Sequence, residues 1–238
     1  MHNTSFFSIH FRRIPLLVEV NKNELQLVGK VLSIKEGYKY EKENFYEIQI
    51  AVNRRSETQD ILPLIIPEKL MFRREIKVGD NITLEGEIRM LNRTENGCKN
   101  IYAFGYVKDF DIFEDQYWDV MEVQNYVKIE GYVCKTPRHR KTTLSNRYIT
   151  DLLIANNRQN NKAFYLPCIC WGFTSKMAAK LQVGDKVSIV GRFQSRRYKK
   201  DPLNGKPKDY SIQEISATEV TLIEEGAAVK KQATKKVV

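Results

Sequence analysis

Apolar and polar residues alternate in short stretches along the chain, and the clearest stretch runs over residues 163–171. One side of it carries four residues that suit a protein core: Phe164, Leu166, Cys168 and Cys170. The other side carries Tyr165, Ile169 and Trp171. Side chains of a β-strand point alternately to its two faces, so this pattern predicts a strand with a buried face and an aromatic outer face.

Similar stretches predict five strands in each half of the chain. In the first half they fall near 23–35, 45–53, 60–66, 80–91 and 100–113, and in the second near 125–135, 146–156, 163–171, 185–198 and 209–223. Helical stretches are predicted near 68–75 and 174–181, between the third and fourth strands. This is the element order of an OB-fold, a five-stranded Greek-key barrel. The predicted fold class is all-β, with two tandem OB-folds.

The two halves also repeat their residues in register. Asn23 to Val31 returns as Asn125 to Val133, and Ile50 to Arg54 returns as Ile154 to Arg158. Three more matches follow in the same order: Leu62-Pro63 with Leu166-Pro167, Val78-Gly79-Asp80 with Val183-Gly184-Asp185, and Leu84-Glu85-Gly86 with Ile189-Val190-Gly191. Five ordered matches at a nearly constant offset indicate a tandem duplication of one domain.

These observations divide the chain into five parts. They are an N-terminal extension over 1–22, a first OB-fold over 23–113, a linker over 114–124, a second OB-fold over 125–225 and a basic, flexible tail over 226–238. The linker is acidic but includes Tyr117 and Trp118, and large apolar residues in a linker usually dock onto something. We therefore expect a short, packed linker.

The formal net charge of +10 lies entirely in the second half of the chain. Residues 1–118 carry 17 Lys plus Arg against 18 Asp plus Glu, whereas residues 119–238 carry 22 against 11. Only four of these lysines belong to the tail, so the second OB-fold is itself basic. A polyanion is the partner that this charge predicts.

Sequence patterns for catalysis and metal binding are missing. There is no phosphate-binding P-loop, no GxSxG and no HExxH, and the chain has only 3 histidines. Its 4 cysteines form no CxxC pair. We expect no enzyme, no metal and no cofactor. No apolar run is long enough to cross a bilayer, so we also expect no membrane contact and a cytoplasmic location.

Candidate nucleic-acid contacts gather around the outer face of strand 163–171. Tyr165 and Trp171 can stack on bases, worth about 1–3 kcal/mol per base, although packing beneath a loop or a helix would also explain them. The next strand places Arg192, Arg196 and Tyr198 on one side. Basic residues suited to phosphate contacts complete the set: Arg138, Arg140, Lys141, Arg147, Arg158, Lys199 and Lys200.

Residues 125–224 resemble the bacterial single-stranded DNA-binding protein family. Six ordered blocks carry the resemblance: Asn125 with Gly131-Tyr132-Val133, Lys135-x-Pro137-x-x-Arg140-x-Thr142, Leu153-Ile154-Ala155-x-Asn157-Arg158, Tyr165-Leu166-Pro167-Cys168-x-x-Trp171-Gly172, Gly184-Asp185-x-Val187 and Gly191-Arg192-x-Gln194-Ser195-Arg196-x-Tyr198. The resemblance implies that Tyr165, Trp171 and Tyr198 stack on bases, with Arg140 and Arg196 near the DNA backbone. It also implies sequence-independent binding of single-stranded DNA at the nucleoid, in replication, recombination and repair. Two OB-folds per chain then suggest a homodimer with four barrels.

The first OB-fold departs from this pattern. It has Ile61, Pro67 and Arg93 where the second has its three aromatic residues. We expect it to serve mainly in assembly, with outer-face Ile61 and Ile65 turned toward a protein partner.

The end of the chain departs as well. Family members usually end in an acidic tail with a hydrophobic tip that recruits replication and repair proteins, whereas this chain ends in lysines, which suit nonspecific nucleic-acid affinity. Two alternatives stay open. One is a primosomal-type OB-fold accessory protein that acts mainly through protein contacts, and the other is an RNA-binding OB protein, since stacking and phosphate contacts serve both polymers.

Overall fold

The structure is a computed structural model of the chain and describes residues 20–40, 43–54, 58–95, 98–120, 124–142, 146–159, 162–200 and 208–226. Within these ranges lie eleven strands, two α-helices and one 3-10 helix, so the fold is all-β as predicted. Most of the predicted extension 1–22 and of the tail 226–238 lies outside the described residues.

The first five strands close into a ring. They are β1 (Asn23–Tyr40), β2 (Glu43–Asn53), β3 (Gln59–Pro67), β4 (Asn81–Glu95) and β5 (Cys98–Phe113), and helix α1 (Glu68–Arg73) follows β3. β1 pairs with β2, β2 with β3, β3 with β5, β5 with β4, and β4 again with β1. Only the β3–β5 pair is parallel. We call this set the first ring.

The same pairing scheme recurs in the second half. The second ring consists of β6 (Asn125–Val133), β8 (Tyr148–Asn157), β9 (Ala163–Trp171), β10 (Lys186–Lys200) and β11 (Lys208–Glu224), with α2 (Gly172–Ala178) after β9. β6 pairs with β8, β8 with β9, β9 with β11 in parallel, β11 with β10, and β10 with β6. This is the strand order of an OB-fold.

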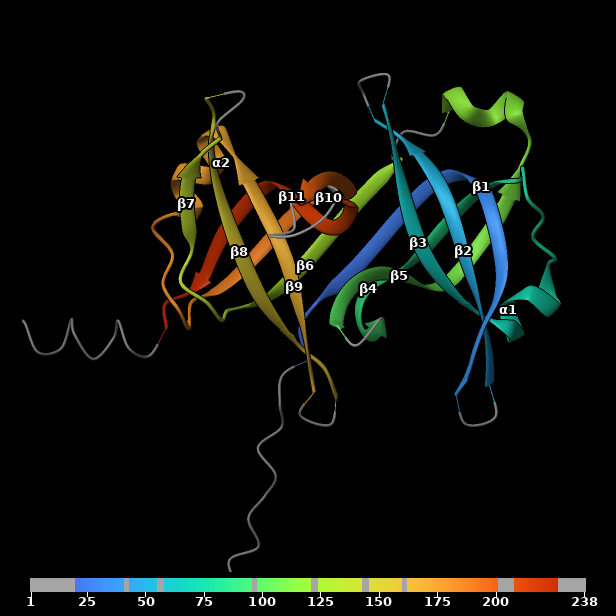
Figure 1. Cartoon of the computed structure of the whole chain (residues 1–238), viewed down its shortest axis with the longest axis horizontal. Coiled ribbons are helices and arrows are strands. Elements are labelled where there is room, and N and C mark those ends of the chain that lie inside the picture. Colours follow the sequence, from blue (N-terminus) through green and yellow to red (C-terminus); the bar gives the residue numbers. More distant parts are fainter. Residues whose placement is uncertain are drawn as a thin grey trace, which may run out of the picture.

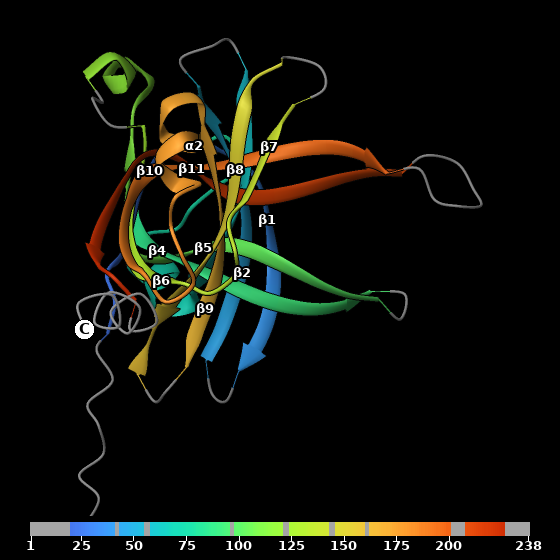
Figure 2. The same ribbon diagram turned by 90° about the vertical axis from the view of Figure 1, so that its left-hand side faces the viewer.

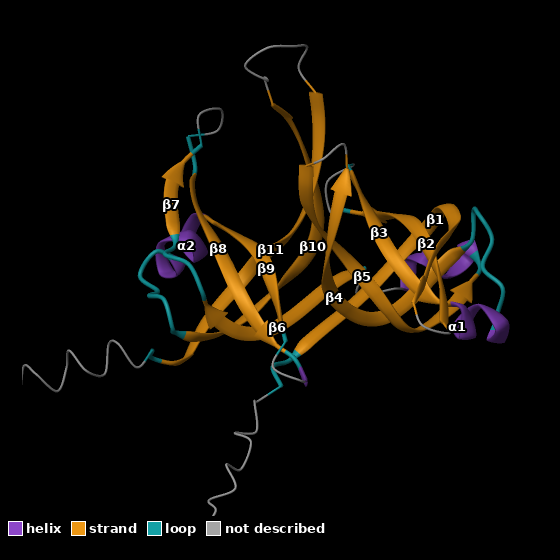
Figure 3. Ribbon diagram, turned by 60° about the horizontal axis from the view of Figure 1, so that its bottom comes forward, coloured by secondary structure: helices purple, strands orange, loops and turns teal. Residues whose placement is uncertain are grey.

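All ten predicted strands and both predicted helices are present, with small differences at their ends. The second ring also has β7 (Arg138–Lys141), which pairs with β8 in a segment predicted as a loop. The rings lie side by side (Figure 1), and α1 and α2 sit at opposite ends of the molecule (Figure 3). The β4–β5 and β10–β11 hairpins project from the same side (Figure 2).

The two rings are joined through their first strands. β1 pairs with β6 in antiparallel register, with Leu25 opposite Val127 and Asn23 opposite Ile129. The apolar members of these pairs are at most 1% exposed and belong to one cluster of buried residues that extends through both rings. Because the rings share this core, we expect them to unfold together.

The repeated asparagines at the start of the two halves have the same structural role. Asn23 accepts a hydrogen bond from the backbone N–H of Ile88 at 2.9 Å and donates one to its carbonyl at 2.8 Å. Asn125 makes the same pair of bonds with Phe193, at 2.8 and 2.7 Å. Each side chain thus extends the pairing of its strand beyond the backbone ladder, which accounts for one sequence match between the halves.

Two predictions about side-chain direction can be compared with burial. Cys168 and Cys170 point into the second ring as predicted, and burial raises the pKa of both thiols, that of Cys170 to about 12. The prediction that Ile65 faces a protein partner is wrong, because Ile65 is 3% exposed and packs in a cluster with Phe45 and Phe104 of its own ring.

The linker contains a 3-10 helix, η1 (Asp115–Val120). Trp118 contacts the ring of Phe113 edge-on, with centroids 5.2 Å apart. Asp115 accepts a hydrogen bond of 2.6 Å from Asn81 in β4, and this bond lowers the pKa of the Asp115 carboxyl. The described part of the linker is therefore attached to the first ring.

Candidate nucleic-acid interface

A cavity of about 510 Å³ lies where β10 of the second ring faces the first ring. Four arginines line it: Arg54, Arg147, Arg192 and Arg196. Its remaining wall consists of Trp171, Gln194, Ser195 and Ser216. Arg54 comes from the first ring and the others from the second. Such a lining suits an anionic group next to a flat ring.

The alternation along β10 places its polar side chains at this cavity. Phe193 is fully buried in the core, so its neighbours Arg192 and Gln194 point to the opposite face of the strand. Arg196 lies on the same face and pairs with Glu214 of β11 through Nε at 3.0 Å and Nη2 at 3.3 Å. The predicted grouping of Arg192 and Arg196 is thus present.

Trp171 ends β9 at the edge of the cavity, with 37% of its surface exposed. Gly172 follows it with φ +55°, a conformation that favours glycine, and the chain turns there into α2. Tyr165, on the same strand, is 55% exposed but does not line the cavity. Tyr165 and Trp171 are six positions apart along the strand, about 20 Å, so their aromatic side chains can contact different bases of one DNA strand.

The prediction that Ile169 shares this exposed face is wrong. Ile169 is only 2% exposed. It lies between Asp151 of β8 and Ser216 of β11, to which it is paired in the sheet, so neighbouring strands flank it on both sides. Trp171 lies at the end of β9, where flanking cover is less complete.

The predicted basic residues near 138–147 lie on and beside β7. Arg138 and Lys141 are exposed, and the Lys141 ammonium lies 5.4 Å from the ring centre of Tyr148. Arg140 is half-buried and pairs with Asp151 at 2.9 Å. Of this group, Arg147 reaches the cavity. In the described structure, Arg140 therefore has an acidic partner, Arg138 and Lys141 are exposed on β7, and Arg147 lines the cavity.

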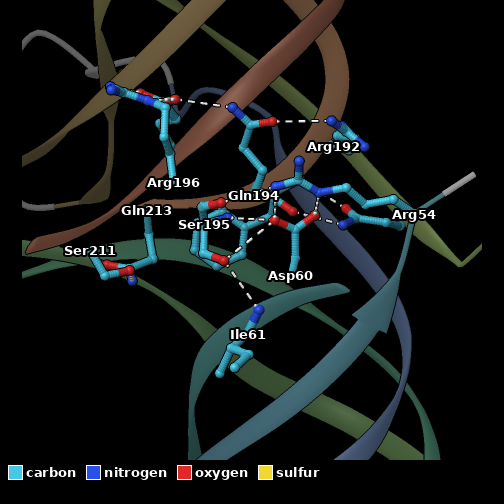
Figure 4. Close-up of polar contacts among 12 residues, drawn as sticks. Arg54, Asp60, Ile61, Arg192, Gln194, Ser195, Arg196, Ser211 and Gln213 are labelled. Atoms are coloured by element: carbon cyan, nitrogen blue, oxygen red, sulfur yellow. Dashed lines mark hydrogen bonds and ion pairs between the residues drawn. The ribbon is translucent and has the colours of Figure 1, made fainter. Parts of the chain in front are cut away.

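Arg54 is held in place by a network that joins the two rings (Figure 4). Its Nε and Nη2 donate to the carboxylate of Asp60 at 2.8 and 2.5 Å, and Nη2 also donates to the carbonyl of Ser195 at 3.0 Å. The buried Asp60 in turn accepts a 2.8 Å bond from the Ser195 N–H, and the Ile61 N–H donates to the Ser195 hydroxyl at 3.1 Å.

Arg192 lies in the cavity wall beside this network. Burial lowers the pKa of its guanidinium, and the nearby charge of Arg54 lowers it further. Its Nη2 donates to Gln194 at 3.2 Å. Among the described residues, no carboxylate lies within ion-pair distance of Arg192, so its charge faces the cavity without an acidic partner.

Arg158 was predicted to contact nucleic acid, and the structure places it elsewhere. Its Nη2 donates to both carboxylate oxygens of Glu87, in β4 of the first ring, at 2.9 Å. Glu87 is 0% exposed and also contacts Arg89 and Lys108, each at 2.7 Å. Arg158 therefore ties the second ring to the first, away from the cavity.

The remaining predicted residues are Tyr198, Lys199 and Lys200. They belong to β10, where they pair with the start of β11, but their side chains lie outside the described residues. The sequence interpretation missed Arg54, whose only signal was its match to Arg158 in the repeat.

Metal sites and membrane-spanning helices were sought among the described residues. The described residues contain no group of three or more His, Cys, Asp or Glu placed to hold a metal ion. None of the described helices combines the length and apolar character needed to span a membrane.

Comparison with known proteins supports a nucleic-acid interface on the second ring. Residues 124–223 match the model of the single-strand binding protein family. The wild-type single-stranded DNA-binding protein of Thermus aquaticus has the same fold, with a TM-score of 0.68, 15% identity and coverage of 87% of this chain and 96% of that one. A deletion mutant of that protein matches with a TM-score of 0.67, at the same identity and coverage. No curated relative matches the chain. Over residues 124–223, the chain is therefore similar to the single-strand binding protein family.

Proposed function

We propose that the chain binds single-stranded DNA without sequence preference and covers strands exposed in replication, recombination and repair. The match of residues 124–223 to the single-strand binding protein family and the name of the Thermus protein support this proposal. The observation that carries it is the cavity itself, in which Trp171 lies among four arginines. Aromatic rings beside cations are the two components of sequence-tolerant strand binding.

The proposed division of work follows from the chemistry of these groups. Trp171 stacks on one base and Tyr165 on another, and stacking is sequence-tolerant because every base has a flat face. Arg147 and Arg192 line the cavity and contact phosphates, since no carboxylate pairs with either of them among the described residues. Arg138 and Lys141 on β7 extend the positive surface along the second ring.

The second ring provides most of the proposed binding surface. In the first ring, the positions of Tyr165 and Trp171 are taken by Ile61 and Pro67, which offer no ring for base stacking. Pro67 is buried, and the backbone of Ile61 is bonded to Ser195 of the second ring. We propose that this face of the first ring mainly supports the second ring.

Binding is expected to weaken with salt. For a single strand, log affinity falls with log salt by about 0.7 for each phosphate contact, so two or more contacts give a slope of about −1.4 or steeper. The test is a titration of the full chain with oligo-dT at several salt concentrations, followed by tryptophan quenching. Matched duplex and oligo-U run in parallel.

Weak duplex binding with tight, salt-sensitive oligo-dT binding is the expected result. Equal binding of oligo-U would favour the RNA-binding alternative. Weak binding to all three ligands would contradict the proposal and favour an accessory OB-fold protein that acts through protein contacts.

A further inference from the structure

Besides the β1–β6 pairing and a contact between β5 and β11, the two rings meet at two equivalent junctions. At the first junction β4 of the first ring contacts β9 of the second, and at the second junction β10 of the second ring contacts β3 of the first. β4 and β10 hold the same place in their rings, as do β3 and β9. Residues at one junction therefore have counterparts at the other, and the two can be compared position by position.

At each junction an arginine reaches from one ring to the other, and these two arginines hold equivalent positions in their rings. Arg158 and Arg54 both follow an asparagine at the end of the second long strand of their rings. Arg158 reaches Glu87 of the first ring, and Arg54 reaches the carbonyl of Ser195 in the second. Arg158 thus faces β4, and Arg54 faces β10.

The facing residues are Glu87 and Arg192, and they are counterparts. Each directly follows a glycine, Gly86 or Gly191, that ends a β-bulge in the pairing with the next strand. At the first junction a buried carboxylate therefore meets an arginine. At the second, an arginine occupies the place of that carboxylate.

The second junction consequently has unbalanced positive charge. Of the four arginines that line its cavity, Arg54 has Asp60 as a partner and Arg196 has Glu214. Among the described residues, no carboxylate pairs with Arg147 or Arg192, which leaves two positive charges at the cavity. At the first junction, by contrast, the buried carboxylate of Glu87 contacts three cations, Arg89, Lys108 and Arg158.

We infer that a phosphodiester of the bound strand occupies the second junction, between Arg54 of the first ring and Arg192 of the second. The phosphodiester takes the place at the second junction that the Glu87 carboxylate holds at the first. It lies beside the base that stacks on Trp171. A guanidinium suits this role because its fork of N–H donors matches phosphate oxygens. Arg54 is preorganised, since Asp60 and Ser195 hold its Nε and Nη2 and no described residue bonds its Nη1.

This inference rests on the proposed function and adds the first ring to its site. The test uses the full chain and oligo-dT of about 30 nucleotides, long enough to cover two OB-folds. Arg54→Gln is expected to weaken binding and to reduce the salt slope by about 0.7, the contribution of one phosphate contact. The matched control is Arg74→Gln, which removes the same charge from an exposed ion pair with Asp111 next to α1, and should leave the slope unchanged.

A second variant tests the same site in a folded background. Arg192→Glu gives the second junction the carboxylate that the first has, so it should pair with Arg54 and keep the thermal midpoint of the wild type. The salt slope is expected to fall by about 1.4, because two phosphate contacts are lost. Wild-type affinity and slope in this variant would overturn the inference, as would an unchanged slope in a folded Arg54→Gln variant.

Failure of the proposed function would look different. In that case wild-type protein would not bind oligo-dT with salt-dependent affinity at all. If wild type binds and Trp171→Ala weakens it while both junction variants bind normally, the proposed function stands and the phosphate site at the junction does not.

Discussion

Replacing Glu87 by glutamine is expected to lower the free energy of unfolding by about 3 kcal/mol. The carboxylate is fully buried and contacts Arg89, Lys108 and Arg158 at 2.7 to 2.9 Å. Its removal leaves three cations without their counter-charge, and breaking a buried pair in this way costs about 3–5 kcal/mol. We expect the lower end of this range of free energies because the Lys108 side chain is 52% exposed and can turn toward water.

The measurement is urea unfolding of wild type and Glu87→Gln at neutral pH. Glu85→Gln is the matched control, since Glu85 lies on the same strand and is exposed to solvent. For a chain of this size the loss corresponds to a thermal midpoint about 6–12 °C lower. Both variants unfolding like the wild type would show that the cluster does not stabilise the junction. A double variant with Arg158→Gln should lose less than the sum of the single losses.

The contribution of Glu87 should also depend on pH. Burial by itself would raise the pKa of Glu87, but the bonds from Lys108 and Arg89 and the charges of Arg89 and Arg158 outweigh it, so the pKa lies below its ordinary value of 4.5. The stabilisation is therefore complete above about pH 4.5 and is lost as pH falls through the lower pKa of the folded state. The difference in stability between wild type and Glu87→Gln should shrink over that range. A difference that stays constant down to pH 3 would contradict this assignment.

The alternation of apolar and polar residues was enough to predict the strands because each ring has one buried face. β10 shows this, since buried Phe193 alternates with polar Arg192 and Gln194. β7 was missed because Arg138 to Lys141 are all charged or polar, so no alternation marks them. Its strand structure comes from pairing with β8, which a local pattern does not reveal.

The candidate site could be predicted only within the second ring. Trp171, Arg192 and Arg196 were found because they lie close together in sequence on two strands of one barrel. Arg54 was missed because it reaches the cavity across the junction, 141 residues from Ser195. Arg158 was assigned to nucleic acid for its charge alone, and only the fold shows Glu87 beside it. Contacts between the rings decide which arginines face the cavity.

Replacing Trp171 by alanine is expected to weaken oligo-dT binding by about 1–3 kcal/mol, which is about 5- to 150-fold in affinity. The side chain lines the cavity and is 37% exposed, so its removal takes away a stacking surface without opening the core. The thermal midpoint should therefore change little. Phe173→Ala is the control, because Phe173 is a 79% exposed aromatic residue two positions away that does not line the cavity.

Trp171→Phe separates stacking from fluorescence. The chain has 2 tryptophans, and the linker residue Trp118 packs on Phe113 of β5 and does not line the cavity. Phenylalanine keeps a flat ring at the site, so affinity measured by anisotropy of labelled oligo-dT should stay close to that of the wild type. Tryptophan quenching should nearly disappear, because only Trp118 remains. Full quenching in this variant would show that the strand passes Trp118 and would remove Trp171 from the binding site, as would normal affinity in a folded Trp171→Ala variant.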